Sequence, residues 1–239
     1  MIRCLANIKN QNRLLMRNLA FIVVAIAVLA SCQNKPEGEQ AKTGQEQEVK
    51  KAAAEADPFT VDTQNSVVNW LGTKPGGEHY GTVQLKSGQL QVKEGMIQGG
   101  NFVLDMASIK SLDIEDENMN AKLVGHLKSP DFFNVESYPE ASFKITDVKA
   151  IKDAAQTAKG LQPTHEISGN LTVKDITKNI SFPAQVSVTD GTIEAKTPQF
   201  LINRTDWEVN YKSKSVFNDL KDNFIGDDMG IRISLTATK

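Results

Sequence analysis

Strict alternation of apolar and polar residues is the feature of this chain that most limits its possible folds. In the last segment, residues 231–238, Ile231, Ile233, Leu235 and Ala237 alternate with polar residues. A period of two is typical of a β-strand that buries one face. Shorter alternating groups recur upstream, at Val83/Leu85, Leu90/Val92, Phe102/Leu104/Met106, Phe143/Ile145, Leu171/Val173, Val186/Val188 and Phe200/Ile202. The sequence therefore predicts an all-β fold of about eight antiparallel strands.

Turn signals separate several of the predicted strands. Asp190-Gly191, Ser87-Gly88 and Glu94-Gly95 each lie between two alternating segments. Asp-Gly favours the type I′ turn, because both central residues of that turn need positive φ, and the other two pairs favour it more weakly. We therefore expect a tight hairpin at each of the three places.

One segment interrupts the alternation. In residues 116–128, Met119, Leu123 and either Leu127 or His126 have helical spacing, which predicts a short amphipathic helix that ends before Pro130. We expect a second helical turn at residues 215–220. Antiparallel strands with so little helix close into a barrel or stack as a sandwich. An eight-stranded barrel has room inside for packed side chains or for one small ligand.

The N-terminal segment has the pattern of an export signal. Arg17 precedes an unbroken apolar run over residues 19–30, and the small residues Ala30 and Ser31 lead into Cys32. A basic start, an apolar run and small residues form the three parts of a secretory signal. The run is shorter than the roughly 20 residues that a spanning helix needs. The sequence leaves open whether Met1 or Met16 begins the chain.

Residues 29–32 (LASC) resemble the lipobox of bacterial lipoproteins, in which the cysteine is acylated and becomes the first mature residue. The resemblance implies a signal peptide at residues 1–31, attachment to a membrane through the acylated Cys32, and a location in the cell envelope. Gln33-Asn34 favours the outer membrane, facing the periplasm. Residues 32–57 are polar and predict a flexible tether with a reach of about 25–30 Å. Residues 58–239 are long enough for one domain with a substantial core.

Charge and motif spacing exclude several classes of function. Four of the 27 lysines and arginines, and no acid, precede Cys32, which leaves 23 basic residues against 29 acidic ones, a formal charge of about −6. Such a domain does not suit nucleic acid, whose phosphates require clustered Lys and Arg. Both cysteines precede the domain, which excludes disulfides and thiolate chemistry within it. His79, His126 and His165 lack metal-ligand spacing, and no nucleophile motif is present. We expect neither a cofactor, nor a metal, nor enzyme activity.

Five segments resemble the YceI-like domain, in the order in which that family has them. The longest, residues 126–143 (HLKSPDFFNVESYPEASF), is similar to the family pattern H/D-L-K-S-x-D-F-F-D-V-x-x-Y-P-x-A-x-F. The other four are residues 79–83, 102–109, 169–178 and 203–207. The resemblance extends from about residue 59 to the C-terminus. It implies a lipocalin-like antiparallel barrel that holds an isoprenoid or similar lipid inside, without catalytic residues.

The candidate binding residues are those that such a barrel would direct inward. The apolar candidates for the cavity lining are Trp70, Phe102, Leu104, Met106, Leu123, Leu127, Phe132, Phe133, Phe143, Phe182 and Phe200. Alternation does not distinguish a hollow barrel from a solid one, because both direct apolar side chains inward. The candidates for contact with a polar ligand head are His126, Arg204 and Trp207. The alternatives are packing of His126 at the barrel mouth, and a structural corner in which Arg204 and Asp206 form an ion pair beneath the indole of Trp207.

Two hypotheses of function follow. The first is a membrane-anchored lipoprotein that binds a long-chain amphiphile, an isoprenoid quinone or a polyprenyl lipid, for carriage or sequestration in the cell envelope. The second is an envelope interaction module with a solid barrel core, in which exposed loops such as residues 151–163 bind a partner. A continuous internal cavity favours the first hypothesis and a solid core favours the second. The sequence leaves the oligomeric state open.

Overall fold

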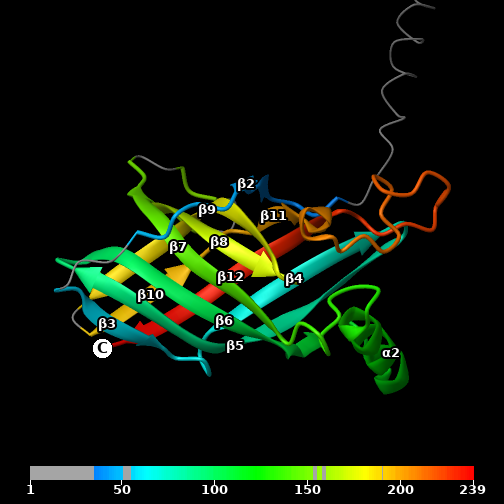
Figure 1. The fold of residues 1–239 in the computed structure, drawn as a ribbon, viewed down its shortest axis with the longest axis horizontal. Coiled ribbons are helices and arrows are strands. Elements are labelled where there is room, and N and C mark those ends of the chain that lie inside the picture. Colours follow the sequence, from blue (N-terminus) through cyan, green and yellow to red (C-terminus); the bar gives the residue numbers. More distant parts are fainter. Residues whose placement is uncertain (1–34, 51–54, 153–154, 158–159, 190) are drawn as a thin grey trace, which may run out of the picture. The chain divides into compact units, whose positions relative to one another are not determined.

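A computed structural model describes residues 35–50, 55–152, 155–157, 160–189 and 191–239 (Figure 1). The described residues are mostly strand, which confirms the predicted all-β class. The strands are β1 (Glu39–Gln40), β2 (Lys42–Gln45), β3 (Asp57–Val61), β4 (Val67–Lys74), β5 (Gly77–Lys93), β6 (Met96–Ser111), β7 (Glu140–Ala150), β8 (His165–Val173), β9 (Ile176–Thr189), β10 (Thr192–Lys196), β11 (Phe200–Asn203) and β12 (Asp228–Thr238). The helices are α2 (Glu117–Lys128) and the 3₁₀ helix η2 (Arg204–Trp207).

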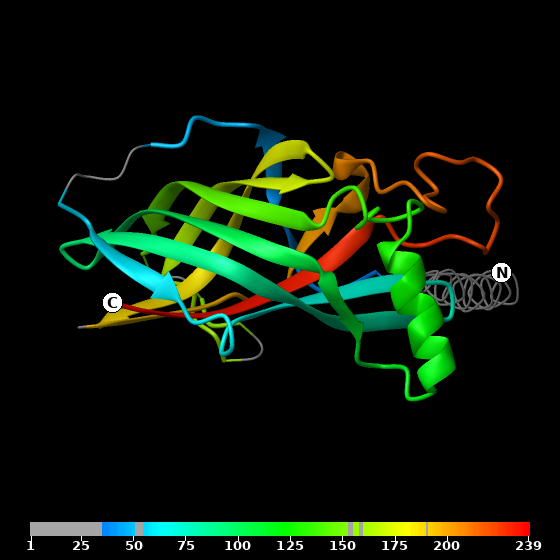
Figure 2. The same cartoon turned by 60° about the horizontal axis from the view of Figure 1, so that its bottom comes forward.

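The sheet closes on itself through its last strand. Consecutive antiparallel partners lead from β12 through β10, β9, β8, β7, β6, β5 and β4, and β4 pairs with β12 again. On one edge β12 pairs with β10 and β11, and on the other edge it pairs with β3 and β4. The result is a ring of eight strands, which we call the barrel (Figures 1 and 2).

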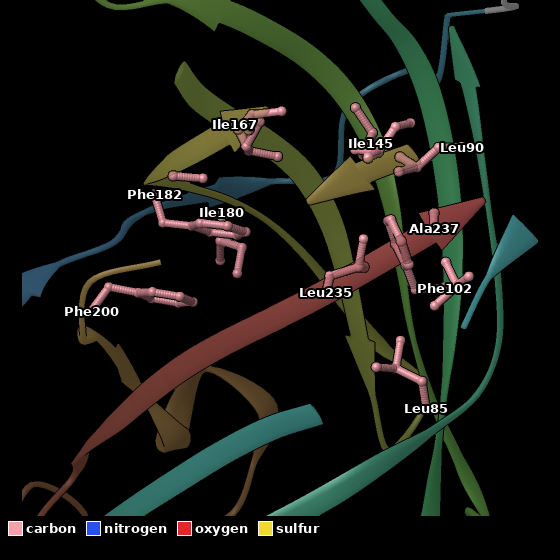
Figure 3. Packing of buried hydrophobic residues seen from close by; sticks show 14 of the residues in the cluster. Leu85, Leu90, Phe102, Ile145, Ile167, Ile180, Phe182, Phe200, Leu235 and Ala237 are labelled. Atoms are coloured by element: carbon pink, nitrogen blue, oxygen red, sulfur yellow. The ribbon is translucent and has the colours of Figure 1, made fainter. Parts of the chain in front are cut away.

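Apolar residues from all around the ring meet inside the barrel. Figure 3 shows Leu85, Phe102, Phe182 and Leu235 directed inward from four different strands. The rings of Phe182 and Phe200 stack with their centroids 4.4 Å apart. A second cluster of buried residues lies beside α2 and comprises Trp70, Val83, Met106, Ile109, Val135 and Ala141. These clusters explain the alternation in the sequence, since every second residue of a strand faces the interior.

Two of the expected local features are present. The hairpin at Glu94-Gly95 joins β5 to β6, and both residues have positive φ, 53° and 74°. The helix predicted over residues 116–128 is α2: the Asp116 side chain accepts a hydrogen bond from the Met119 N–H, and Ser129 caps the C-terminus. No residue of α2 is fully buried, and it lies across one end of the barrel (Figure 2).

Two other local predictions are wrong, and a third is not fully described. β5 continues through Ser87-Gly88, with an irregularity in its pairing to β6 instead of a hairpin. Gly88 is needed there for space, because a Cβ would lie 2.6 Å from Cγ2 of Val61. Residues 215–220 form turns and no helix. Asp190 of the third predicted hairpin lies outside the described residues, although Thr189 and Thr192 pair beside it.

Part of the predicted tether forms strands against the barrel. β1 runs parallel to β11, and β2 runs antiparallel to β9. Between them Ala41 is only 5% exposed, and its N–H donates to the Leu201 carbonyl over 2.8 Å. β10 pairs with residues 185–189 of β9, which leaves residues 178–181 of β9 free to pair with β2. Because β1 pairs with β11, the two short strands together fill the gap between β9 and β11. We call residues 35–50 the strap. Its polar composition indicated disorder, but its pairing depends on backbone groups that any composition supplies.

The strap also covers a polar cluster on the outside of the barrel. The Gln47 N–H donates to Oδ1 of Asn170 over 3.0 Å, and Nδ2 of Asn170 donates to the Gln47 carbonyl over 2.7 Å. Nδ2 of Asn179 donates to Oδ1 of Asn170 and to Oγ1 of Thr146. All three polar side chains beneath the strap are buried. The strap therefore supplies partners to groups that would otherwise be left unpaired.

Removing the strap is expected to destabilise the barrel. A chain that begins at Asp57 loses the pairing of β1 and β2 and the Gln47–Asn170 hydrogen bonds. At about 0.5–1.5 kcal/mol for each hydrogen bond, and with part of this offset by ordering entropy, the free energy of unfolding should fall by about 2 kcal/mol or more. Urea denaturation, with a chain that begins at Lys35 as the control, measures the difference. Equal midpoints for the two chains would contradict a structural role for the strap.

Gly81 of β5 occupies a place that no other residue fits. A Cβ there would overlap the carbonyl oxygen of Lys110 and lie 2.8 Å from Cζ2 of Trp70. Because the obstacle includes backbone, Gly81→Ala should lower the free energy of unfolding by about 2–3 kcal/mol. A Cβ at Gly72, on the adjacent β4, would meet no other atom within 4 Å, so Gly72→Ala is the matched control and should not destabilise. Thermal denaturation of the two variants checks both expectations.

Candidate functional site

The barrel encloses an internal cavity of about 220 Å³. Each strand of the ring contributes side chains to its lining, and Leu127 of α2 and Phe133 contribute from the helix end. Apart from Thr197 and Arg204, the lining residues are aliphatic or aromatic. The cavity is therefore suited to an apolar ligand.

Several interior side chains remain only partly buried. Phe143, Leu171, Ile231 and Ile233 line the cavity and pack against the buried core, but they are not fully buried themselves. Accessible surface on inward-facing residues is expected when the space in front of them is not filled by side chains. The described barrel is therefore hollow.

The predicted lining residues divide into two groups. Nine of them line the cavity: Trp70, Phe102, Leu104, Met106, Leu127, Phe133, Phe143, Phe182 and Phe200. Leu123 and Phe132 are absent from the lining. Leu123 packs against the cluster beside α2, and the ring of Phe132 contacts His126 and Tyr211. Contact of any of these residues with a ligand stays a prediction.

Many aliphatic residues that line the cavity are not among the predicted lining residues. Examples are Ile167, Leu171, Ile180, Ile231 and Ile233. Leu171, Ile231 and Ile233 belong to the alternating groups from which the strands were predicted. The alternation alone would have identified them, whereas the candidate set gave priority to aromatic residues.

Arg204 forms a structural corner. Its side chain is 3% exposed, and its Nε and Nη2 donate to the carbonyls of Gly226 and Ile225, each over 3.0 Å. Nη1 donates to the Val209 carbonyl, and Nη2 lies 3.3 Å from Oδ1 of Asp227. Burial lowers the pKa of Arg204, and the nearby Asp227 carboxylate raises it in part. Because these contacts occupy most of the guanidinium donors, they favour the corner over contact with a ligand head.

The two tryptophans that line the cavity, Trp70 and Trp207, differ in their hydrogen bonding. Nε1 of Trp207 donates to the Leu171 carbonyl over 3.1 Å, which ties η2 to β8. Nε1 of Trp70 is buried and has no hydrogen-bond partner among the described residues. The Trp207 indole therefore belongs to the corner with Arg204, as the structural alternative expected, although the ion-pair partner is Asp227 and not Asp206.

His126 lies outside the cavity lining and joins α2 to the following segments. Its Nε2 lies 3.1 Å from Oδ2 of Asp131, and its ring meets the rings of Phe132 and Tyr211 edge-on, at 5.1 and 4.7 Å. This arrangement agrees with the packing alternative. Within the described ranges, no three His, Cys, Asp or Glu side chains are grouped so that they could hold a metal ion. None of the helices that these residues form has the length and hydropathy needed to cross a membrane.

A second histidine contacts a carboxylate at the same end of the barrel. Nδ1 of His79 lies 2.7 Å from Oδ2 of Asp113, and the Tyr80 N–H and the Ser111 hydroxyl donate to the other carboxylate oxygen. Burial raises the pKa of Asp113, but the hydrogen bonds from His79, Tyr80 and Ser111 together lower it below its usual value. The pair holds the start of β5 against the segment that leads into α2.

Comparison with solved structures identifies the same fold in bacterial proteins. Burkholderia cenocepacia BcnA superposes with a TM-score of 0.55 at 19% identity, over 74% of this chain and 99% of that one. A second structure is described as a polyisoprenoid binding domain from Saccharophagus degradans, implicated in plant cell wall breakdown. It superposes with a TM-score of 0.52 at 14% identity, over 75% of this chain and 97% of that one. At these identities the likeness concerns the fold alone.

Sequence comparison matches both a family and individual relatives. The family model described as "YceI-like domain" matches residues 59–237. A UPF0312 protein of Pseudomonas aeruginosa is 39% identical over 61 residues, 26% of this chain and 27% of the relative. A UPF0312 protein of Pseudomonas putida is 32% identical over 92 residues, 36% of this chain and 43% of the relative. The matched regions span less than half the length of these relatives.

Proposed function

The chain belongs to the YceI-like domain family, and from that premise we propose that it binds a long-chain amphiphile inside its barrel and is anchored to a bacterial membrane through an acylated Cys32. The amphiphile is an isoprenoid quinone or a polyprenyl lipid, carried or sequestered in the cell envelope. The observation that carries the proposal is the cavity, which is lined almost wholly by apolar side chains. The name of the Saccharophagus degradans domain, which has the same fold, supports a polyisoprenoid as the ligand class.

Burial of apolar surface is the expected source of affinity. A tail of about eight isoprene units would bury several hundred Å², worth on the order of 10 kcal/mol before the costs of association. The one charged side chain in the lining, Arg204, is engaged by backbone carbonyls and Asp227. The proposed mode of binding therefore depends on the tail and leaves the head without a charged clamp.

The anchor and the location rest on the N-terminal sequence. Cys32 and the predicted signal peptide lie outside the described residues. The basic start, the apolar run and the LASC ending support acylation of Cys32, and the residues that follow favour the outer membrane, facing the periplasm. The competing hypothesis was an interaction module with a solid barrel core. The cavity argues against a module with a solid core.

Mass spectrometry of the protein purified from its native envelope, without refolding, tests the proposal. Organic extracts should contain one polyprenyl or quinone species in stoichiometric amount. The intact mass should carry the acyl groups on a chain that begins at Cys32. Repeated recovery of a folded protein without lipid would contradict carriage. Cys32→Ser is the control for anchoring, and it should release the protein from the membrane fraction.

A further inference from the structure

We propose that the end of the barrel covered by α2 docks on the lipid bilayer, so that this end of the cavity faces the membrane that holds the anchor. The inference rests on the proposed acylation of Cys32. It adds to that proposal the orientation of the barrel at the membrane. Three observations support it: the small number of residues between Cys32 and the strap, the position of exposed apolar side chains, and the approach of the cavity lining to this end.

The strap brings the anchor close to the barrel. Nζ of Lys35 lies 2.8 Å from Oδ2 of Asp228, the first residue of β12, and Nε2 of Gln199 donates to the Glu37 carbonyl over 2.6 Å. Cys32 precedes Lys35 by three positions, and a fully extended chain of that length spans at most about 11 Å. An acylated Cys32 would therefore hold the start of β12 near the lipid headgroups, not at the distance that a long flexible tether would allow.

The start of β12 lies at the same end of the barrel as α2. β12 is preceded by the loop of residues 208–227, and the Gly226 N–H donates to the Thr73 carbonyl at the end of β4 over 2.7 Å. The ring of Tyr211 in that loop meets His126 of α2. Figure 2 shows α2 and the loop (orange) together at one end, and the C-terminus at the other.

Exposed apolar side chains gather on these segments. Of the seven exposed large hydrophobic residues in the described ranges, five belong to this end: Tyr80, Leu112, Met119, Val216 and Phe217, each 45–57% exposed. Leu112 and Tyr80 are neighbours, because the Leu112 N–H donates to the Tyr80 carbonyl. Met119 lies on α2, and Val216 and Phe217 lie in the loop. Leu127, also on α2, and Phe133, which follows α2, line the cavity.

The bilayer suits this surface better than a protein partner does. The apolar residues come from a helix, a strand, a strand end and a loop, and Lys122, Lys212 and Lys214 lie among them in the sequence. The exposed acids Glu115, Asp116 and Glu117 also lie there, between Leu112 and Met119, so the surface carries both signs of charge. Single apolar side chains scattered among charged ones suit the interface between headgroups and acyl chains, where long side chains such as lysine keep their charge in water. The membrane is also the one partner that an anchor at Cys32 would place within about 11 Å of this end.

Tryptophan substitution in the acylated full-length protein tests the orientation. Met119→Trp and Phe217→Trp report on the docking end, and Met96→Trp is the matched control, because Met96 is 59% exposed at the far end of β5 and β6. The two native tryptophans are buried and give the same background in all variants. Each variant is placed in vesicles of phosphatidylethanolamine and phosphatidylglycerol whose acyl chains are brominated, because bromine quenches indole fluorescence only at close range.

Bromolipid should reduce the emission from the indole introduced by Met119→Trp or Phe217→Trp by at least about half, and leave the Met96→Trp variant unchanged. Equal emission from all three variants, or quenching of the Met96→Trp variant alone, would overturn the proposed orientation. The intact mass of the same sample shows whether Cys32 is acylated, and its organic extract shows whether lipid is bound. An acylated, lipid-loaded protein without quenching would therefore refute the docking surface and leave the proposed function standing.

Discussion

Replacing Ile233 with tryptophan is expected to abolish lipid carriage while the barrel remains folded. Ile233 lies on β12, lines the cavity and is only partly buried, so a larger side chain has free space in front of it. An indole there would occupy part of the 220 Å³ that the ligand tail needs. The lipid extracted per protein should fall at least about tenfold, the equivalent of about 1.4 kcal/mol of lost binding.

Ser234→Trp is the matched control for this prediction. Ser234 is the next residue of β12, outside the cavity lining, so the same indole would face outward. Circular dichroism and thermal denaturation should show that both variants fold, since added volume is tolerated where a cavity accepts it. Undiminished lipid in a folded Ile233→Trp variant would mean that the ligand does not occupy the cavity.

Replacing Arg204 with methionine is expected to cause the largest loss of stability. The substitution keeps an unbranched apolar stem but leaves the carbonyls of Val209, Ile225 and Gly226 without their donor and Asp227 without its counter-ion. Removing one partner of a buried, hydrogen-bonded ion pair costs about 3–5 kcal/mol. Urea denaturation, followed by tryptophan fluorescence, should show a loss of that size.

Arg232 provides the control within the same fold. Residues 35–239 contain two arginines, and Arg232 is partly exposed, with Nη2 at 3.3 Å from Oε1 of Gln199. Arg232→Met should change the free energy of unfolding by no more than about 0.5 kcal/mol. If Arg204→Met were equally mild, the corner would not stabilise the loop of residues 208–227, and the guanidinium would be available for another role.

The sequence predicted those parts of the fold that depend on local pattern. Alternation predicted the strands because each strand has one face toward the interior. The spacing of Met119, Leu123 and Leu127 predicted α2, and Glu94-Gly95 predicted the hairpin after β5. The same kind of turn signal failed at Ser87-Gly88, because the glycine there accommodates Val61, which is distant in the sequence. A local pattern does not report such a neighbour.

The strap and the cavity depend on features that the sequence does not carry locally. The strap has almost no apolar residues, and its place is created by the divergence of β9 and β11, strands more than 130 residues further along the chain. The hollow interior depends on how many strands the ring contains and how they are tilted, while alternation specifies only which side chains face inward. For the same reason, the sequence identified only some of the cavity-lining residues correctly. Phe143 lines the cavity, whereas Phe132, also predicted to line it, packs outside it against His126.

The position of β12 determines when the ring can form. This strand pairs with β3 and β4 near the start of the domain, and Oγ of Ser66 donates to the carbonyl of Thr236, 170 positions away. Contacts of such long sequence separation give a high contact order, which is associated with folding in milliseconds to seconds. Until β12 has paired, β4 and β10 each retain an unpaired edge that can associate with other chains. The nascent protein therefore passes through an aggregation-prone stage in which chaperones that bind unfolded chains have time to act.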